Sequence, residues 1–216
     1  MRILNGMETA VHIPERLAQR KELMEDLRAP ASWASFLELA EKADYRLEYD
    51  DGQIISLMGY GSEAHELLVA QMIFLLKSIL QEVDDAFRIY GSNLALQTPG
   101  SAQQYFNADC TVVYGQPDQV ELSAHMQAVT NPVLLVEVLS APTYEYDLRH
   151  KFKKYKQMPS IQQVLYVDSS EQSVMSYLRK PEEDGWLLQE FSNATDAIPV
   201  LEHGSISLAE LYRDLA

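Results

Sequence analysis

The sequence predicts an α/β (α+β) protein in which a mixed β-sheet is flanked by helices. Two observations lead to this prediction. The middle of the chain is rich in β-like runs, and a long, mostly apolar helical stretch at 63–83 precedes them. A second helical stretch at about 145–157 separates two apolar β-runs, which is typical of a crossover helix packed on a sheet.

The first 30 residues are predicted to form a helical appendage, and residues 31–216 to form the main domain. Pro14 can open a helix that carries Leu17, Leu23 and Leu27, and Pro30 ends it. A second helix is expected at 32–42. A β-hairpin is then expected over 45–58, because Asp51-Gly52 separates two β-like runs.

Ser62 is the expected N-cap of the long helix at 63–83, whose apolar residues cover most of its circumference. The remaining expected elements are strands at 87–90, 93–97, 105–114, 133–140, 163–168, 173–179 and 186–191, and a closing helix after Ser207. The segment at 115–131 is expected to be an excursion loop or a short helix.

Composition limits the function classes. The formal net charge of −15 disfavours broad, non-specific binding to nucleic acid, because such a chain repels a polyanion at long range. No signal peptide or membrane span is evident, and the single cysteine, Cys110, fits a reducing compartment, so a cytoplasmic, non-membrane protein is expected. Nucleophile-elbow, P-loop, dinucleotide-binding and zinc-protease motifs are not found in the sequence.

Glu137 is the most informative residue, because it interrupts the apolar run Val133–Leu139. Such a run is typical of a central strand buried on both faces, where an ionised carboxylate needs a cation or several donors. Two interpretations remain open. Glu137 is either a metal ligand or a structural carboxylate that pairs with a lysine or arginine or leans out at the end of the strand.

Asp109 repeats this pattern at the start of another apolar run, Cys110–Tyr114. If the two strands are neighbours, both carboxylates can point to one face of the sheet. Such a pair suits Mg²⁺ or Mn²⁺, which prefer oxygen ligands. Taken alone, Asp109 is more typical of a strand entry or a turn.

The stretch after the central strand carries five of the 17 basic residues within eight positions. Leu148, Phe152 and Tyr155 form its expected inward stripe, and Lys151 lies at the border of that stripe. Lys151 is therefore either a site lysine or half of a surface ion pair with Asp147. Arg149 and Lys154 are candidates to bind a phosphate backbone, although the same patch can be an ordinary solvated helix face.

The ordered set of motifs resembles the Uma2-like family (domain of unknown function 820), a branch of the PD-(D/E)xK nuclease superfamily that is abundant in cyanobacteria. The matching pieces are Tyr45-Arg-Leu-Glu48, Asp51-Gly52, Ser62-Glu-Ala-His65, Ala108-Asp109, Val136-Glu-Val-Leu-Ser140, Pro142-Thr143, Asp147-Leu148, Lys151, Tyr155 and Val164-Leu-Tyr-Val-Asp168. They cover roughly residues 32–180. The chain departs from the pattern at Ala108, where a proline is usual, and at Gln53, where a glutamate is frequent.

The resemblance implies a restriction-endonuclease-like mixed β-sheet flanked by helices. It also implies a Mg²⁺-dependent endonuclease that hydrolyses nucleic acid, with DNA as the favoured substrate. Asp109 and Glu137 match the family's acidic residues, Glu48 its N-terminal acidic position, and His65 a histidine near the long helix. Leu139 stands at the usual lysine position, so the lysine role falls to Lys151.

In this hypothesis Asp109, Glu137, Glu48 and the carbonyl of Val138 hold the ion, while Lys151 orients water or offsets developing charge. His65 either contacts substrate or a carboxylate, or is simply a packed helix-cap histidine. Two further expectations are a homodimer, because soluble oligomers are commonly twofold, and, as the alternative function, a catalytically inactive nuclease fold that serves as a scaffold or protein-interaction module.

Overall fold

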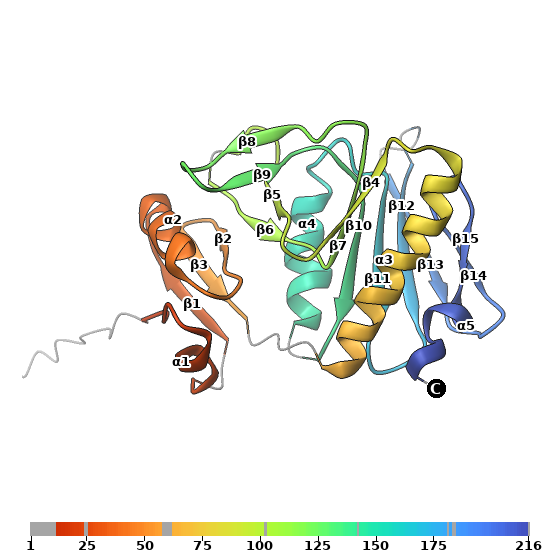
Figure 1. Cartoon of the computed structure of the whole chain (residues 1–216), viewed down its shortest axis with the longest axis horizontal. Helices are drawn as coiled ribbons and strands as arrows, with labels where there is room; N and C mark the ends of the chain where they lie inside the picture. Colours follow the sequence, from red (N-terminus) through yellow and green to blue (C-terminus); the bar gives the residue numbers. More distant parts are fainter. Residues whose placement is uncertain are drawn as a thin grey trace, which may run out of the picture.

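The computed structural model describes residues 12–23, 26–57, 62–101, 103–141, 143–180, 182 and 185–215. Within this part of the chain, six strands form a central mixed sheet in the order β13-β12-β11-β10-β7-β4 (Figure 1). Strands β10 and β11 are parallel, and the other neighbouring pairs are antiparallel. The strands are β4 (Phe87–Gly91), β7 (Cys110–Tyr114), β10 (Pro132–Leu139), β11 (Gln163–Asp168), β12 (Val174–Lys180) and β13 (Gly185–Phe191). The expected mixed sheet is confirmed.

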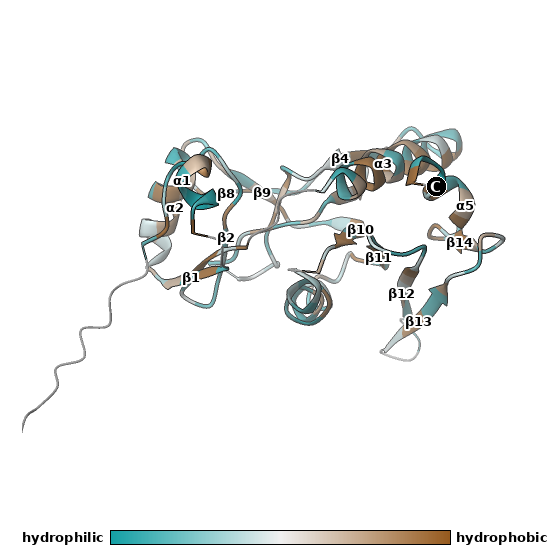
Figure 2. Cartoon of the chain, turned by 90° about the horizontal axis from the view of Figure 1, so that it is seen from below, coloured by the Kyte–Doolittle hydropathy of each residue, from teal (hydrophilic) through white to brown (hydrophobic). Residues whose placement is uncertain are grey.

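Strand β10 is apolar on both of its sides, and both sides must be shielded from water. Helices accordingly cover both faces of the central sheet. Leu134, Val136 and Val138 of β10 pack toward α3 (Glu63–Val83), whereas Leu135 and Leu139 pack toward the opposite helix. That opposite helix consists of a π-helical turn, η1 (Tyr146–Lys151), followed by α4 (Phe152–Tyr155). Figure 2 shows the hydrophobic strands β10 and β11 beneath α3. The predicted bounds of α3 and its Ser62 cap, which accepts from the His65 amide at 3.1 Å, are confirmed.

The C-terminal part adds a second layer on the α3 side of the sheet. The hairpin β14 (Ala197–Pro199) and β15 (Ser205–Ser207) leads into α5 (Leu208–Leu211) and a short 3₁₀ turn, η3 (Arg213–Leu215). Ile198, Ile206 and Leu208 are buried in the same apolar cluster as α3. The closing helix after Ser207 was expected from the sequence, whereas the hairpin before it was not.

The N-terminal lobe lies to one side of the sheet (Figure 1) and contains a small three-stranded sheet, β1-β3-β2. Its elements are α1 (Leu17–Lys21), β1 (Leu27–Pro30), α2 (Trp33–Lys42), β2 (Glu48–Asp50) and β3 (Gln53–Ser56). The predicted helical appendage is wrong from Leu27 onward. Leu27 and Ala29 alternate with exposed residues and pack on Phe36 and Ile54, so a strand buries them where a helix would not. The expected hairpin is confirmed over the described residues 48–56, and Met58 lies outside them.

Three further expectations need correction. The segment at 115–131 is neither a loop nor a helix but contains the hairpin β8 (Gln119–Glu121) and β9 (Gln127–Val129), which joins a four-stranded sheet with β5 (Ala95–Leu96) and β6 (Phe106–Asn107). The expected strand at 105–114 is divided into β6 and β7. The expected helix at 145–157 is shorter and begins with the π-helical turn. The three residues of β8 are all exposed, and so short a run has no pattern long enough to identify a strand.

The N-terminal lobe is joined to the central domain by polar contacts. Buried Asp50 on β2 accepts from Lys154 at 2.9 Å and from Gln104 at 3.1 Å, and lies 2.8 Å from His150 Nε2. Tyr49 also exchanges two backbone hydrogen bonds with Tyr105. A pocket lies between the two parts, lined by residues of the N-terminal lobe and of the central sheet. In the described part of the chain, the helices are all too short or too polar to span a membrane.

Candidate active site

Asp109 and Glu137 lie on one face of the central sheet because of the register between β7 and β10. Val136 pairs with Cys110 at the end of this antiparallel ladder, so the next residues outward, Glu137 and Asp109, are opposite each other. Directly opposite residues of antiparallel strands share a face. Both carboxylates are buried, and both line a pocket of about 500 Å³ between the N-terminal lobe and the sheet.

Lys151 reaches this pocket from η1 and contacts three carboxylates. Its Nζ lies 3.2 Å from Glu137 Oε1, 3.1 Å from Glu48 Oε1 and 3.1 Å from Asp147 Oδ1. It also donates to the Asn107 carbonyl at 2.9 Å. The lysine side chain is only 7% exposed, so it is neither half of a surface ion pair nor at the border of the helix stripe. The sequence-predicted residues Glu48, Glu137 and Lys151 are thus brought together.

Two tyrosines fix the orientation of the carboxylates around Lys151. Tyr155 donates its hydroxyl proton to Glu137 Oε1 in a short hydrogen bond. Tyr146 donates to Glu48 Oε2 at 2.7 Å, while Glu48 Oε1 accepts from the Asn107 amide at 3.2 Å. Sequence reasoning placed Tyr155 on the inward stripe without this role and missed Tyr146. Tyrosine spacing along a helix does not reveal which carboxylate its hydroxyl group will meet.

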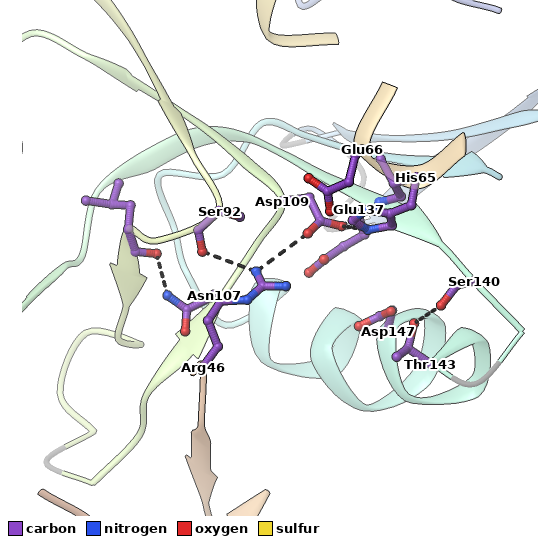
Figure 3. Close-up of polar contacts among 12 residues, drawn as sticks. Arg46, His65, Glu66, Ser92, Asn107, Asp109, Glu137, Ser140, Thr143 and Asp147 are labelled. Atoms are coloured by element: carbon purple, nitrogen blue, oxygen red, sulfur yellow. Dashed lines mark hydrogen bonds and ion pairs between the residues drawn. The ribbon is translucent and has the colours of Figure 1, made fainter. Parts of the chain in front are cut away.

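Asp109 is held by a different set of groups. Its Oδ2 accepts from the Val138 amide at 2.9 Å and lies 3.2 Å from His65 Nε2, and its Oδ1 is 3.6 Å from Arg46 Nη1. Figure 3 shows Arg46 and His65 approaching Asp109 from opposite sides. The N–H and C=O of one strand residue point to the same side. The Val138 carbonyl therefore also faces the Asp109 side, beyond the end of the ladder with β7.

The electrostatics of the site follow from a shortage of cations. Burial raises the pKa of Glu137 well above its ordinary value, and repulsion from Asp147 and Asp109 adds to this against the attraction of Lys151. Burial alone would lower the pKa of Lys151, but the surrounding Asp147, Glu137 and Glu48 outweigh it and raise that pKa. Lys151 therefore remains a cation amid an excess of carboxylates.

Asp109 and His65 form a coupled pair at the pocket's edge. Burial acts to raise the pKa of Asp109, but hydrogen bonding and attraction from His65, together with Arg46, lower it overall. Burial likewise acts to lower the pKa of His65, but hydrogen bonding and attraction from Asp109 and Glu66 together outweigh it and raise this pKa. The predicted contact of His65 with a carboxylate is thus present.

Comparison with known proteins assigns the chain to a family. The model of the Uma2 family, described as "putative restriction endonuclease", matches residues 33–209. The chain belongs to the Uma2 family. Two uncharacterized proteins of the cyanobacterium Synechocystis sp. (strain PCC 6803) are similar to it. One is 32% identical over 73% of this chain and 85% of its own length, and the other is 31% identical over 84% and 90%.

A solved structure shares the fold of this Uma2 protein. It is described as a "putative nuclease belonging to DUF820" from Anabaena variabilis, and it aligns with a TM-score of 0.67 at 18% identity. The alignment covers 87% of this chain and all of that one. At this identity the similarity establishes the restriction-endonuclease-like architecture alone.

Both sequence-predicted substrate-binding residues of this Uma2 protein lie outside the pocket. Lys154 Nζ is bound to buried Asp50 at 2.9 Å, and exposed Arg149 pairs with Glu145 at 2.9 Å. Neither side chain lines the pocket that holds Asp109 and Glu137. The cations that do line it on the N-terminal side are Arg20, Lys21 and Arg46, which the sequence analysis did not select.

The donor chemistry of the pocket suits a hard divalent cation. Asp109, Glu137 and the Val138 carbonyl offer oxygen atoms from adjacent strand ends, and the buried carboxylates outnumber the cations around them. In the described residues, no three side chains of the Asp, Glu, His and Cys types converge as a ready metal cluster. Glu48 is engaged by Lys151, Tyr146 and the Asn107 amide, so the fitting set comprises Asp109, Glu137 and Val138.

Proposed function

We propose that this protein is a divalent-cation-dependent nuclease that hydrolyses phosphodiester bonds in nucleic acid, with DNA as the favoured substrate. The observation that carries the proposal is the meeting of Asp109 and Glu137, from neighbouring strands, in one pocket that Lys151 enters from a helix. Family membership and the structural neighbour support the same class of activity.

Asp109, Glu137 and the Val138 carbonyl are the groups that would hold Mg²⁺ or Mn²⁺. Such an ion supplies Lewis acidity toward a phosphoryl oxygen and lowers the pKa of water. Lys151 fixes Glu137 and places a positive charge beside the reacting phosphoryl group, where negative charge develops. Glu48 and Asp147 hold the lysine in that position, so Glu48 is a positioning residue here.

His65 lies at the edge of the proposed metal site. Its bond to Asp109 orients that carboxylate, and its position at the start of α3 puts the imidazole at the rim of the pocket. Its other ring nitrogen, Nδ1, lies 3.3 Å from Glu66 Oε1, so this nitrogen would donate to a substrate phosphate by exchanging the exposed Glu66 for it while Nε2 keeps Asp109. The histidine thus serves both to orient a ligand and to contact substrate.

The test compares cleavage of labelled single-stranded and duplex DNA by the purified protein with and without Mg²⁺. Removing one group that stabilises transition-state charge typically costs about 10²–10³ in rate, so Asp109→Asn and Glu137→Gln should abolish metal-dependent cleavage. Glu190→Gln, an exposed residue on edge strand β13, is the matched control and should cleave like the wild type. Equal background activity in the wild type and Glu137→Gln would rule out catalysis at this site.

The competing function is an inactive scaffold, which the acidic composition and the departures from the family pattern at Ala108 and Gln53 favour. Calorimetric titration with Mn²⁺ separates the two functions. The nuclease proposal expects binding that is lost in Asp109→Asn and Glu137→Gln while both variants remain folded. Absence of binding to the folded wild type would support the scaffold.

A further inference from the structure

A second pocket of about 440 Å³ lies next to the carboxylate pocket, and the proposed function does not use it. It is lined by Tyr45, Arg46, Asn93, Tyr105 and Asn107, among others, and we call it the tyrosine–asparagine pocket. Asp44, Tyr45 and Arg46 line both pockets, so the two cavities are adjacent. Its volume is within the usual range for small-molecule sites.

Arg46 stands between the two pockets. Its Nη1 donates to the Ser92 carbonyl at 3.2 Å and lies 3.6 Å from Asp109 Oδ1 (Figure 3). Both contacts use Nη1, so Nε and Nη2 remain available to a ligand, and the side chain is 43% exposed. A guanidinium with a free planar edge suits a phosphate group. Arg46 can thus bind the phosphate that joins a nucleotide in one pocket to a nucleotide in the other.

The lining of the tyrosine–asparagine pocket suits a flat, polar-edged ring. Tyr45 and Tyr105 supply aromatic rings, and Asn93 and Asn107 supply amides. Asn107 donates Nδ2 to the Leu94 carbonyl at 3.1 Å, but its buried Oδ1 has no hydrogen-bond partner in the described part of the chain. An unmet buried acceptor is costly. Because Oδ1 is shielded as the side chain stands, a ring N–H or exocyclic amine would satisfy it only once the Asn107 amide turns toward the pocket.

Asp44 does not oppose an anionic ligand as strongly as its position suggests. Its Oδ1 accepts from the Leu17 amide at 2.6 Å, and its Oδ2 lies 3.7 Å from Arg16. The carboxylate is therefore directed at α1 and partly neutralised there. Arg46 is the cation that lines both pockets, whereas Arg20, Lys21 and Lys151 line the carboxylate pocket but not the tyrosine–asparagine pocket.

We propose that the tyrosine–asparagine pocket binds the base of an unpaired nucleotide next to the reacting phosphodiester, so that the site acts on single-stranded nucleic acid. This inference rests on the proposed function. A base inside a duplex is stacked and paired, and extracting it costs a few kcal/mol.

The net charge of −15 also favours a single-stranded substrate over a duplex. Duplex DNA carries one negative charge per about 1.7 Å of axis, so an acidic protein repels it more strongly than a single strand. With few cations at the pockets, base–aromatic stacking becomes the main source of affinity. Such stacking tolerates any base.

The test is a binding scan with labelled single-stranded DNA of about twelve nucleotides, measured by fluorescence anisotropy in Ca²⁺ to slow hydrolysis. One base at a time is replaced by an abasic site. We expect one position at which base removal weakens binding by about 5- to 100-fold, and a duplex of the same sequence that competes poorly. Equal binding at all abasic positions, or a duplex that competes as well as the single strand, would overturn the proposal.

Variants then locate the effect. Tyr105→Leu removes one ring, and Asn93→Trp fills the pocket from an exposed position that does not endanger folding. In both variants the intact and abasic strands should bind equally weakly. Arg88→Ala is the control. This exposed arginine on β4 donates a hydrogen bond to the Gly115 carbonyl. It pairs with Val113, four residues from Asp109 along the chain, which corresponds to about 13 Å along the strand. A base-dependent difference that persists in both pocket variants would place the subsite elsewhere and refute the proposal.

The outcomes separate this inference from the proposed function. Metal-dependent cleavage without any base dependence would refute the pocket assignment alone. Base-dependent binding without cleavage of any substrate would refute hydrolysis and leave the binding site intact. Failure of every oligonucleotide to bind would refute both.

Discussion

The two faces of the central sheet differ in chemistry although the same strand, β10, builds both. On the α3 face, Leu134, Val136 and Val138 join a hydrophobic cluster, and the polar side chains buried beside it on β11 and β12, Gln163 and Ser176, are uncharged. On the η1 and α4 face, Glu137 lies between Leu135 and Leu139 and contacts a buried lysine and a buried tyrosine. The α3 face gains stability by removing apolar area from water. On the opposite face several charges lose their hydration, and only their mutual pairing offsets this free-energy cost.

The comparison suggests that the charged face is retained for what it does rather than for stability. A buried ion cluster is often no more stabilising than well-packed apolar residues of the same volume. Here the carboxylates exceed the cations, so the cluster is not even balanced. Substitutions on each of the two faces test this difference.

The largest effect is expected from Lys151→Met. This change leaves Glu48, Glu137 and Asp147 buried without their common cation, and removing one partner of a buried pair costs about 3–5 kcal/mol. Urea unfolding measures the loss of unfolding free energy. Lys77→Met, at an exposed position on α3, is the control and should change stability little. A loss below about 1 kcal/mol for Lys151→Met would mean that the carboxylates do not need their lysine.

A comparable but slightly smaller loss is expected from Leu76→Ala on the apolar face. Leu76 is fully buried in the α3 cluster, and such truncations cost about 2–5 kcal/mol through lost burial and the remaining cavity. Because the change lies on the opposite face, Mn²⁺ binding by the folded variant should match the wild type in calorimetry. Reduced metal affinity in Leu76→Ala would show that the two faces are coupled.

The sequence predicted the parts of this contrast that depend on local pattern. The apolar run around Glu137 and the apolar run after Asp109 predicted two buried strands, and the antiparallel register then places both carboxylates on one face. The bounds of α3 followed from its apolar periodicity and the Ser62 cap. Lys151 was selected from its position beside the inward stripe and again through the family resemblance, but its full burial was not foreseen.

Other parts depend on contacts between distant segments, which a local pattern does not encode. Arg46 reaches Asp109 only because the N-terminal lobe docks beside the sheet, and the loop before it carries no phosphate-binding motif. The π-helical turn of η1 has no sequence signature, although such turns are frequent at functional sites. Leu27 fits a helical stripe as well as a strand, and its pairing with Ser56 decides the outcome.

A smaller change in stability is expected from Glu137→Gln, which tests whether Glu137 is a metal ligand or a structural ion-pair partner. The amide keeps the shape of the side chain and an acceptor for Tyr155, while Lys151 retains Glu48 and Asp147. Unfolding free energy should therefore change by less than about 1.5 kcal/mol, since one charge leaves an overcharged cluster.

Metal titration of the same variant completes this test. Mn²⁺ binding should be lost in calorimetry although the protein is as stable as the wild type. A loss of more than about 3 kcal/mol together with retained metal binding would assign Glu137 a structural role.

The smallest effect is expected on the apolar side of the molecule, where titratable groups stay at the surface. Asp196, in the turn before β14, accepts from the Asn193 and Ser192 amides, each at 2.9 Å, and these bonds lower its pKa below the ordinary 3.8. A carboxylate with a lowered pKa in the folded state stabilises the protein above its ordinary pKa, and this contribution disappears as the pH falls through the folded value. Asp196→Asn should therefore flatten the acid side of the stability profile below pH 3.8. Urea midpoints of both proteins at a series of acidic pH values measure this. Parallel profiles would mean that the turn keeps its bonds when Asp196 is protonated.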